Sequence, residues 1–294
     1  MKRKETNKRP LAIFTADWHL REDQPVCRTD DFQKEQWNKI QFIKDLQNKY
    51  DCLVLHAGDL FHHWKPSPYL LSKTIEHLPN NFWTVAGNHD LPQHNMELIE
   101  KSGIFTLIKA GKINLLSGCH WGGVPDIPRS LAFPTTEETV LVWHVMTWKG
   151  NTPYPNCPDP DCFRLLRKYK EFDVLLTGHN HQSFTAEQDG RLLVNPGCIT
   201  RQEADQTNHK PCIYLWYGET DIQQIFLPHN RGVISREHIE LQQKKTDRID
   251  AFITRLNSEW ESTISFEDNL ERFFASNDIE TDVKDIIYKS IEEQ

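Results

Sequence analysis

Short apolar runs alternate with polar, helix-forming segments over the first part of the chain. Residues 11–16, 53–55 and 83–86 are apolar runs of the kind that form buried strands. Between them, residues 31–50 and 69–78 place apolar side chains at helical spacing on one face. This alternation of strand and helix predicts a layered α/β sheet.

After Lys112 the pattern becomes richer in strands. Apolar runs predict strands at residues 113–116, 140–143, 174–177, 191–195, 212–217 and 222–227, with one helix at 163–170. Before them, residues 95–101 predict a short helix that Gly103 stops. Two stacked mixed β-sheets with helices outside both accommodate this series. We therefore expect an α/β sandwich of four layers, helix, sheet, sheet and helix.

Past Arg236 the strands disappear and helical spacing continues alone. Two sets of apolar residues share this spacing: Ile249, Phe252, Ile253, Leu256 and Trp260, then Ile279, Val283, Ile286, Ile287 and Ile291 after a break near Ser276. They predict a helical pair, residues 237–260 and 266–291. We expect residues 1–235 to form one domain and residues 236–294 to form a helical appendage.

Charge is concentrated in that appendage. The chain of 294 residues has a net charge of -8. Residues 235–294 hold 8 Lys and Arg against 15 Asp and Glu, so the first 234 residues carry a net charge of only -1. Overall charge therefore does not attract nucleic acid to the main domain. Any polyanion must be held there by local basic groups or by metal ions.

The cysteines and the apolar runs indicate a cytoplasmic protein. Seven cysteines, an odd number scattered along the chain, are typical of reduced thiols rather than of a disulfide framework. No apolar run reaches the length of about 18 residues that spans a membrane. The first residues, Met1–Glu5, are not followed by an apolar signal core.

Side chains that can bind metals follow five of the predicted strands. In chain order they are Asp17 and His19, Asp59 and His62, Asn88, His89 and Asp90, His144, and His179 and His181. In open α/β sheets, ligands bind at the carboxyl ends of the strands. Any one of the 14 histidines is explained equally well as a buried or surface residue. Five strands that end in the same way instead predict one shared site.

Seven of these residues form a ligand set of carboxylates, an amide and imidazoles: Asp17, His19, Asp59, Asn88, His144, His179 and His181. Mixed oxygen and nitrogen ligands suit Mn²⁺, Fe²⁺ or Zn²⁺ and disfavour Ca²⁺. Seven ligands are too many for one tetrahedral ion, and they fit two ions that share a carboxylate. Two metals roughly 3.5–4 Å apart are used to displace groups at phosphorus.

These motifs, in this order over residues 11 to about 230, resemble the five motifs of the calcineurin-like metallophosphoesterases. Residues 57–62 (AGDLFH), 66–68 (PSP) and 195–197 (NPG) resemble the SbcD-type nucleases of double-strand-break repair complexes. The resemblance implies a DNA exonuclease or endonuclease with two divalent ions, above all Mn²⁺, with Mg²⁺, Fe²⁺ or Zn²⁺ as alternatives. Nucleotides, cyclic nucleotides and phosphoproteins remain alternative substrates. The intact ligand set argues against a non-catalytic scaffold.

The resemblance also implies a role for each residue of the site. One ion is held by Asp17, His19, Asp59 and His181, and the other by Asp59, Asn88, His144 and His179. Asp59 bridges the two ions. The catalytic groups His62 and His89 face the scissile phosphate, and Asp90 orients His89. The nucleophile is a water activated by the metals.

The expected partners follow from the same resemblance. They are DNA and an SMC-like ATPase of SbcC type, which binds the C-terminal helices through the apolar stripes of Phe252, Leu256, Val283 and Ile287. A homodimer is a further possible partner arrangement, and the absence of a long apolar run predicts no membrane contact. In one respect the sequence departs from the family. SbcD-type chains usually carry a capping domain that helps grip duplex DNA, and only a short segment separates the last strand, near Leu227, from Arg236.

Overall fold

The computed structural model describes residues 8–116, 118–123, 131–132, 138–259 and 265–292. The chain divides into two compact units, Met1–Ile234 and Ser235–Gln294. All of the described strands lie in the first unit. In the described part of the chain, no helix is both long enough and apolar enough to cross a membrane.

The first sheet of this unit has six strands, in the order β11-β10-β1-β2-β3-β4. Four neighbours run parallel: β1 (Ala12–Thr15), β2 (Leu53–His56), β3 (Phe82–Thr84) and β4 (Asn114–Leu115). An antiparallel hairpin, β10 (Cys212–Trp216) and β11 (Ile222–Phe226), extends the sheet beyond β1.

The second sheet has five strands, in the order β5-β6-β7-β9-β8. Its three central strands run parallel: β6 (Thr139–His144), β7 (Val174–Gly178) and β9 (Arg191–Asn195). Both edge strands are antiparallel to their neighbours: β5 (Leu131–Ala132) and β8 (Phe184–Gln188). Both sheets are therefore mixed, as expected.

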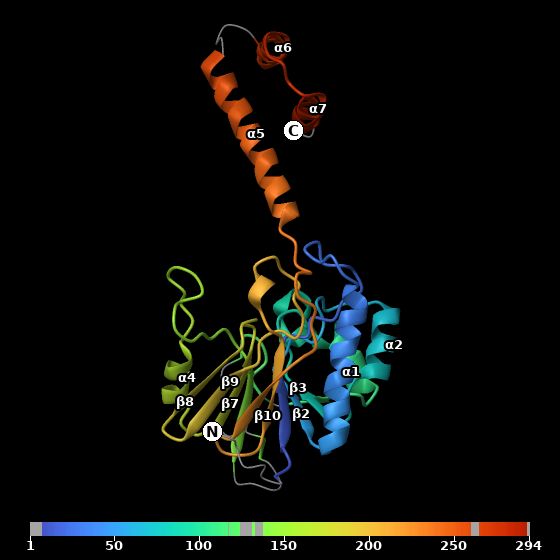
Figure 1. Cartoon of the computed structure of the whole chain (residues 1–294), viewed down its shortest axis with the longest axis vertical. Helices are drawn as coiled ribbons and strands as arrows, with labels where there is room; N and C mark the ends of the chain where they lie inside the picture. The colour runs from blue at the N-terminus through green and yellow to red at the C-terminus, as the bar shows by residue number, and fades with distance from the viewer. Residues whose placement is uncertain (1–7, 117, 124–130, 133–137, 260–264, 293–294) are drawn as a thin grey trace. The chain divides into compact units, whose positions relative to one another are not determined.

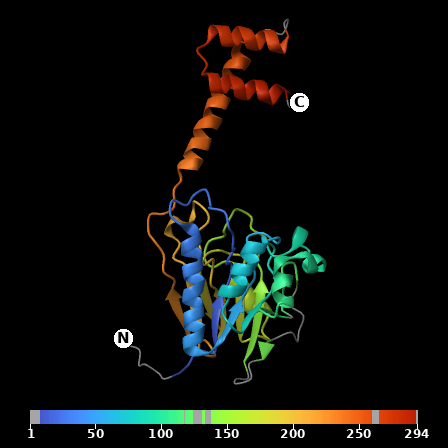
Figure 2. The same ribbon diagram turned by 90° about the vertical axis from the view of Figure 1, so that its right-hand side faces the viewer.

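Alternating side chains of the strands pack in opposite directions and create the layers. Phe14 packs with Val142 and Leu176 between the two sheets, whereas its neighbour Ile13 packs against Ile40 on the helical side. Figure 1 shows α1 (Phe32–Tyr50) and α2 (Pro68–His77) on one side of the sheets, and α4 (Cys162–Lys168) on the other. Figure 2 shows the face that α1 and α2 cover. The predicted sandwich of four layers is confirmed.

The prediction that Gly103 stops a helix is wrong. The preceding segment is a short 3₁₀ helix, η2 (Met96–Lys101), and Gly103 begins a new helix, α3 (Gly103–Lys109). Ser102 is the N-cap of α3, since its side chain accepts a hydrogen bond from the amide of Phe105 at 3.3 Å. Two further 3₁₀ helices are η1 (Pro92–His94) and η3 (Gln206–Asn208). Neither β5 nor β8 was predicted.

The described residues of the second unit form three helices rather than the expected two: α5 (Glu237–Glu259), α6 (Phe266–Ser276) and α7 (Thr281–Glu292). The predicted helix 266–291 is divided, because α6 ends at Ser276 and its C-cap, Asn277, has an extended backbone conformation. Leu270, Phe273 and Phe274 form a small core with Ile287. Trp260 and the side chains of Phe252, Ile253, Leu256 and Ile291 lie outside the described residues.

A buried ion-pair network joins the segment after β1 to helix α1. Glu35 contacts the guanidinium of Arg28 at 2.5 Å through one carboxylate oxygen and the ammonium of Lys39 at 2.5 Å through the other. The side chains of both cations are fully buried. Burial lowers the pKa of Lys39 to about 8, although Glu35 opposes this shift. Two buried cations thus share the carboxylate of Glu35. Among the described residues it is the only ion-pair partner of Lys39, whereas Arg28 also pairs with Asp30 at 2.8 Å.

We expect Glu35→Ala to lower the free energy of unfolding by about 3–5 kcal/mol, because it removes a carboxylate that two buried cations share. Urea unfolding followed by circular dichroism measures the change. The matched control is Glu76→Ala, which removes a side chain that is 78% exposed. It should change the free energy of unfolding by less than about 0.5 kcal/mol. Equal effects of the two substitutions would contradict this role of Glu35.

Candidate metal centre

The candidate site lies at the carboxyl ends of strands from both sheets. Asp17 and Asp59 follow neighbouring strands of the first sheet, and His144 and His179 follow or end neighbouring strands of the second. The pairing of β1 with β2 continues past the strands, since the amides of Asp17 and His19 donate to the carbonyls of Gly58 and Asp59 at 3.0 Å. These bonds keep the two loops side by side as they enter the site.

Several of the predicted ligands have an unusual backbone conformation. The φ angles of Asp17, His19, Asp59 and His179 are 51°, 47°, 58° and 79°, in the left-handed region that most side chains avoid. Such residues cluster at functional sites, where the surrounding structure holds them in place. Sharp turns of this kind direct the side chain that follows each strand into the space between the strand ends.

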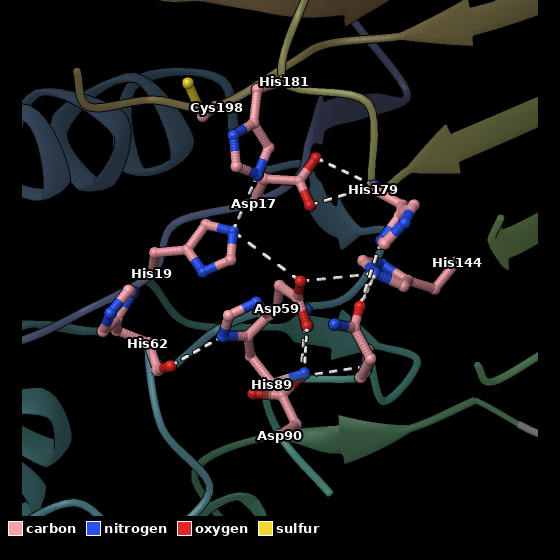
Figure 3. Close-up of polar contacts among 12 residues, drawn as sticks. Asp17, His19, Asp59, His62, His89, Asp90, His144, His179, His181 and Cys198 are labelled. Atoms are coloured by element: carbon pink, nitrogen blue, oxygen red, sulfur yellow. Dashed lines mark hydrogen bonds and ion pairs between the residues drawn. The ribbon is translucent and has the colours of Figure 1, made fainter. Parts of the chain in front are cut away.

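The first ligand group consists of Asp17, His19 and His181, whose ligand atoms lie within 4.8 Å of one another. The Nε2 atoms of His19 and His181 are 3.1 Å apart, and the Nε2 atom of His19 is 3.6 Å from Oδ2 of Asp59. Figure 3 shows both rings on the same side of Asp59. A backbone amide fixes the side chain of Asp17, whose carboxylate accepts a hydrogen bond from the amide of His179 at 3.0 Å.

The second ligand group consists of Asp59, His144 and His179, again within 4.8 Å of one another. Asn88 joins it, because its Oδ1 atom is 3.0 Å from Nε2 of His144 and 3.0 Å from Nδ1 of His179. The Oδ2 atom of Asp59 is 3.3 Å from Nε2 of His144. The same oxygen therefore faces both groups, as a bridging carboxylate requires (Figure 3).

Burial controls the protonation of the imidazoles. It lowers the pKa of His19 well below its usual value, and it lowers the pKa values of His179 and His181 to about 4. At neutral pH these rings are uncharged, and their lone pairs are available to a cation. Burial also disfavours charge on His144, but the carboxylate of Asp59 outweighs it and raises the pKa of His144 to about 9. A cation bound there would replace that proton.

The site residues fit two divalent cations. The Nδ1 atom of His144 donates to the carbonyl of Ala57 at 2.7 Å, which turns its Nε2 atom toward Asp59 and Asn88. Burial would raise the pKa of Asp59, but the charge of His144 outweighs it and keeps the carboxylate ionised. Burial raises the pKa of Asp17 to about 8, so a cation bound there would displace a proton, as at His144. Imidazoles, an amide oxygen and carboxylates that converge in this way are the ligands of Mn²⁺, Fe²⁺ and Zn²⁺.

The two remaining histidines lie beside the first ligand group. The ring of His89 is 4.7 Å from that of His19 and 5.5 Å from that of His62, between centroids. His89 donates from Nδ1 to the carbonyl of His62 at 2.7 Å, which fixes its orientation. His19, His62 and His89 also form a group whose ligand atoms lie within 4.8 Å. His62 and His89 line an open cavity next to the candidate metal site.

The structure corrects the predicted role of Asp90. Its carboxylate accepts the amides of Asp59, Leu60 and Phe61 at 2.9, 3.3 and 3.0 Å, and that of Gly87 at 3.0 Å. Asp90 therefore holds the loop that carries Asp59, whereas the carbonyl of His62 orients His89. A Cβ atom at Gly87 would lie 2.1 Å from the carboxylate of Asp59, so only glycine fits beside this loop.

The comparison with protein families agrees with this geometry. A family described as calcineurin-like phosphoesterase matches residues 12–183, a segment that contains every residue named as a ligand. The chain belongs to this family. Calcineurin-like phosphoesterases are hydrolases of phosphate esters, and the two ligand groups around Asp59 occupy the matched segment.

One similar curated protein is the DNA double-strand break repair protein Mre11 of Haloferax volcanii. It is 27% identical over 169 residues, which are 52% of this chain and 37% of the relative. The chain thus spans little more than a third of that relative. Similar solved structures include an archaeal phosphodiesterase, with a TM-score of 0.41, 16% identity, and coverage of 74% of this chain and 99% of the other. A putative 5'-nucleotidase from Staphylococcus aureus has a TM-score of 0.44, 11% identity, and coverage of 80% and 58%.

Three residues near the ligands of this phosphoesterase were not predicted from the sequence. The ring of Trp121 packs against the ring of His179, with centroids 4.6 Å apart. The amide nitrogen of Gln206 is 3.4 Å from Nδ1 of His181. Arg21, only two residues after His19, lines the cavity. Of the three, only Arg21 had a sequence signal, its position beside the first motif.

We expect Asp59→Asn to weaken both metal sites, because the Oδ2 atom of Asp59 faces both ligand groups. His19→Ala should weaken mainly one site, because His19 belongs to only one of these groups. Elemental analysis after dialysis against Mn²⁺ counts the ions per chain. An Asp59→Asn variant that still binds two ions would contradict the bridging assignment.

Proposed function

We propose that this phosphoesterase is a Mn²⁺-dependent DNA nuclease, the nuclease subunit of a repair complex of SbcCD type. The observation that carries the proposal is the position of Asp59 between two ligand groups, with His62 and His89 on the adjoining cavity wall. Two metals with a shared carboxylate suit phosphodiester hydrolysis. The similarity to a DNA double-strand break repair protein supports DNA as the substrate.

In this proposal the chain's own residues perform the steps around the phosphate. Asp17, His19 and His181 hold one cation, and Asn88, His144 and His179 hold the other, with Asp59 shared. The bound ions supply an activated water and neutralise charge at phosphorus. Burial, assisted by the positive charge of Arg21, lowers the pKa of His62 to about 4. The ring is therefore neutral at pH 7, and it stabilises developing charge by donating an N–H hydrogen bond.

The second unit supplies the proposed site for the ATPase partner. Helices α5 and α7 leave between them a cavity with apolar and charged lining residues: Lys245, Arg248, Ile249, Asp282, Val283, Ile286 and Ile287. Ile249 is 37% exposed, and Ile239 and Leu241 on α5 are 40% and 59% exposed. Apolar side chains grouped on helices in this way favour the docking of a partner helix. The proposed partner surface is the base of the ATPase coiled coil.

One assay separates the proposed nuclease from the other phosphoesterase classes. The purified chain is incubated with Mn²⁺ and linear duplex, single-stranded or hairpin DNA, beside cyclic nucleotides, nucleotides, a phosphopeptide and bis(p-nitrophenyl) phosphate. The proposal expects cleavage of DNA, with slower cleavage of the small diester. Hydrolysis of a nucleotide or phosphopeptide without cleavage of any DNA would assign the site to another class.

His62→Ser should lower the rate of DNA cleavage by about 10²–10⁴-fold, the usual contribution of one acid–base or hydrogen-bonding group. The metal content should stay at the wild-type value, because His62 is proposed to face the phosphate rather than a metal. Single-turnover kinetics measure the rate of DNA cleavage, and elemental analysis measures the metal content. A variant that loses metal would instead place His62 among the ligands, as the group with His19 and His89 allows.

Deletion of residues from Arg236 onward should leave metal binding and small-diester hydrolysis in place, because the first unit is compact by itself. It should abolish co-purification with the SbcC-type ATPase and the stimulation of DNA cleavage by ATP. Val283→Asp in the full chain is the matched point variant, since Val283 lines the cavity of the second unit. A deletion variant that aggregates or loses its metals would show that the helices stabilise the phosphoesterase unit instead.

A further inference from the structure

The cavity beside the first ligand group is lined by two chemically different sets of side chains. One set is the imidazoles of His19, His62, His89 and His181. The other contains Arg21 and Glu203, together with the amide side chains of Gln202 and Gln206. Among the described residues that line this cavity, Arg21 is the only lysine or arginine. A permanent positive charge therefore lies next to the proposed catalytic histidines.

The backbone of Arg21 is fixed independently of its side chain. Leu20 donates to Leu60 at 2.9 Å and accepts the amide of His62 at 3.0 Å, so residues 19–21 pair with the loop that carries the second motif. Helix α1 then holds Arg21 itself. Gln36 accepts its amide at 3.2 Å, and Gln33 donates to its carbonyl at 2.8 Å. The guanidinium thus extends from an anchored position.

The guanidinium is held in the cavity by one exposed carboxylate. Its Nε and Nη2 atoms both donate to Asp23, the first at 2.9 Å, and its Nη1 atom donates to Gln202 at 3.3 Å. The side chain of Arg21 is only 16% exposed, whereas that of Asp23 is 67% exposed. Asp23 can therefore move into solvent without losing a buried environment, while Arg21 stays in place.

A carboxylate bound through two parallel hydrogen bonds is the closest protein equivalent of a phosphate on arginine. We propose that Arg21 binds the phosphate next to the scissile one on the same strand, and that this phosphate displaces Asp23. This inference rests on the proposed nuclease function and extends it. Arg21 then selects polynucleotides over isolated diesters, and Asp23 is an internal competitor that weakens the binding of the polynucleotide.

The charge distribution favours such a local contact. The first 234 residues carry a net charge of only -1, so the surface as a whole does not attract a polyanion. Arg21 and His62 line the same cavity, which places the guanidinium near that ring. An anion on Arg21 therefore lies beside the proposed reaction centre rather than on a distant surface.

The test compares wild type, Arg21→Gln, Asp23→Asn and the double variant, each loaded with Mn²⁺. The substrates are a single-stranded oligonucleotide and bis(p-nitrophenyl) phosphate, which has no neighbouring phosphate. Arg21→Gln should raise KM for the oligonucleotide roughly tenfold, at the lower end for a charged hydrogen bond. It should also reduce the salt slope of log KM by about 0.7, the contribution of one phosphate contact to a single strand. The KM for the small diester should change much less.

Asp23→Asn should act in the opposite direction and lower KM for the oligonucleotide by a factor of up to about 5, as expected for loss of an exposed ion pair. This gain should vanish in the Arg21→Gln background, because the competition requires the guanidinium. The matched control Lys168→Gln removes one charge from α4, on the outer face of the second sheet, and should leave both KM values unchanged.

Several outcomes would overturn the inference. One is equal loss on both substrates for Arg21→Gln. Another is an Asp23→Asn gain that persists in the double variant, which would show only a general effect of net charge. Unchanged KM values would make Arg21 and Asp23 a simple surface ion pair. Failure of the proposed function is distinguishable, because the wild-type protein would then not cleave the oligonucleotide at all.

Discussion

The carboxylate of Asp59 is a buried charge around which the rest of the site is arranged. It is only 1% exposed, and imidazoles rather than lysine or arginine lie next to it. Leaving such a charge unpaired inside a protein is costly. His144 meets part of this requirement by holding a proton, and two shared cations would meet it completely. The need to neutralise one carboxylate thus links both ligand groups.

That carboxylate needs a rigid support. Asp90 provides it by accepting four backbone amides, three from the loop of Asp59 and one from Gly87. The left-handed conformations of Asp17, Asp59 and His179 are tolerated because parallel strands on either side hold these loops. The two stacked sheets therefore form the core and also place the turns at their carboxyl ends side by side. The paired strands hold these strained turns, so the ligand side chains have fixed positions.

The proposed recognition of a polyanion is concentrated at the same place. The main unit is nearly neutral and the second unit is acidic. The proposed attraction of a polyanion therefore depends on bound metal ions and on single basic residues such as Arg21. Asp23 covers that arginine in the free protein. The acidic helices form a compact unit separate from the phosphoesterase unit. This division is compatible with the proposal that the helical unit binds a protein partner and the phosphoesterase unit binds the phosphate backbone.

The sequence by itself determined the layered sheets and the candidate ligands, because both follow from local patterns. A short apolar run predicts a strand. A polar residue that follows the run lies at the carboxyl end of that strand, and this placement does not depend on contacts with distant parts of the chain. Tertiary structure decided what depends on partners far along the chain. Asp90 bonds to amides about 30 residues away, the amide of Gly103 at the start of α3 donates to the distant carbonyl of Trp64, and Arg21 faces the site because Leu20 pairs beside Leu60. Hydrogen bonds between separate segments have no periodic signature, so only the packed structure reveals them.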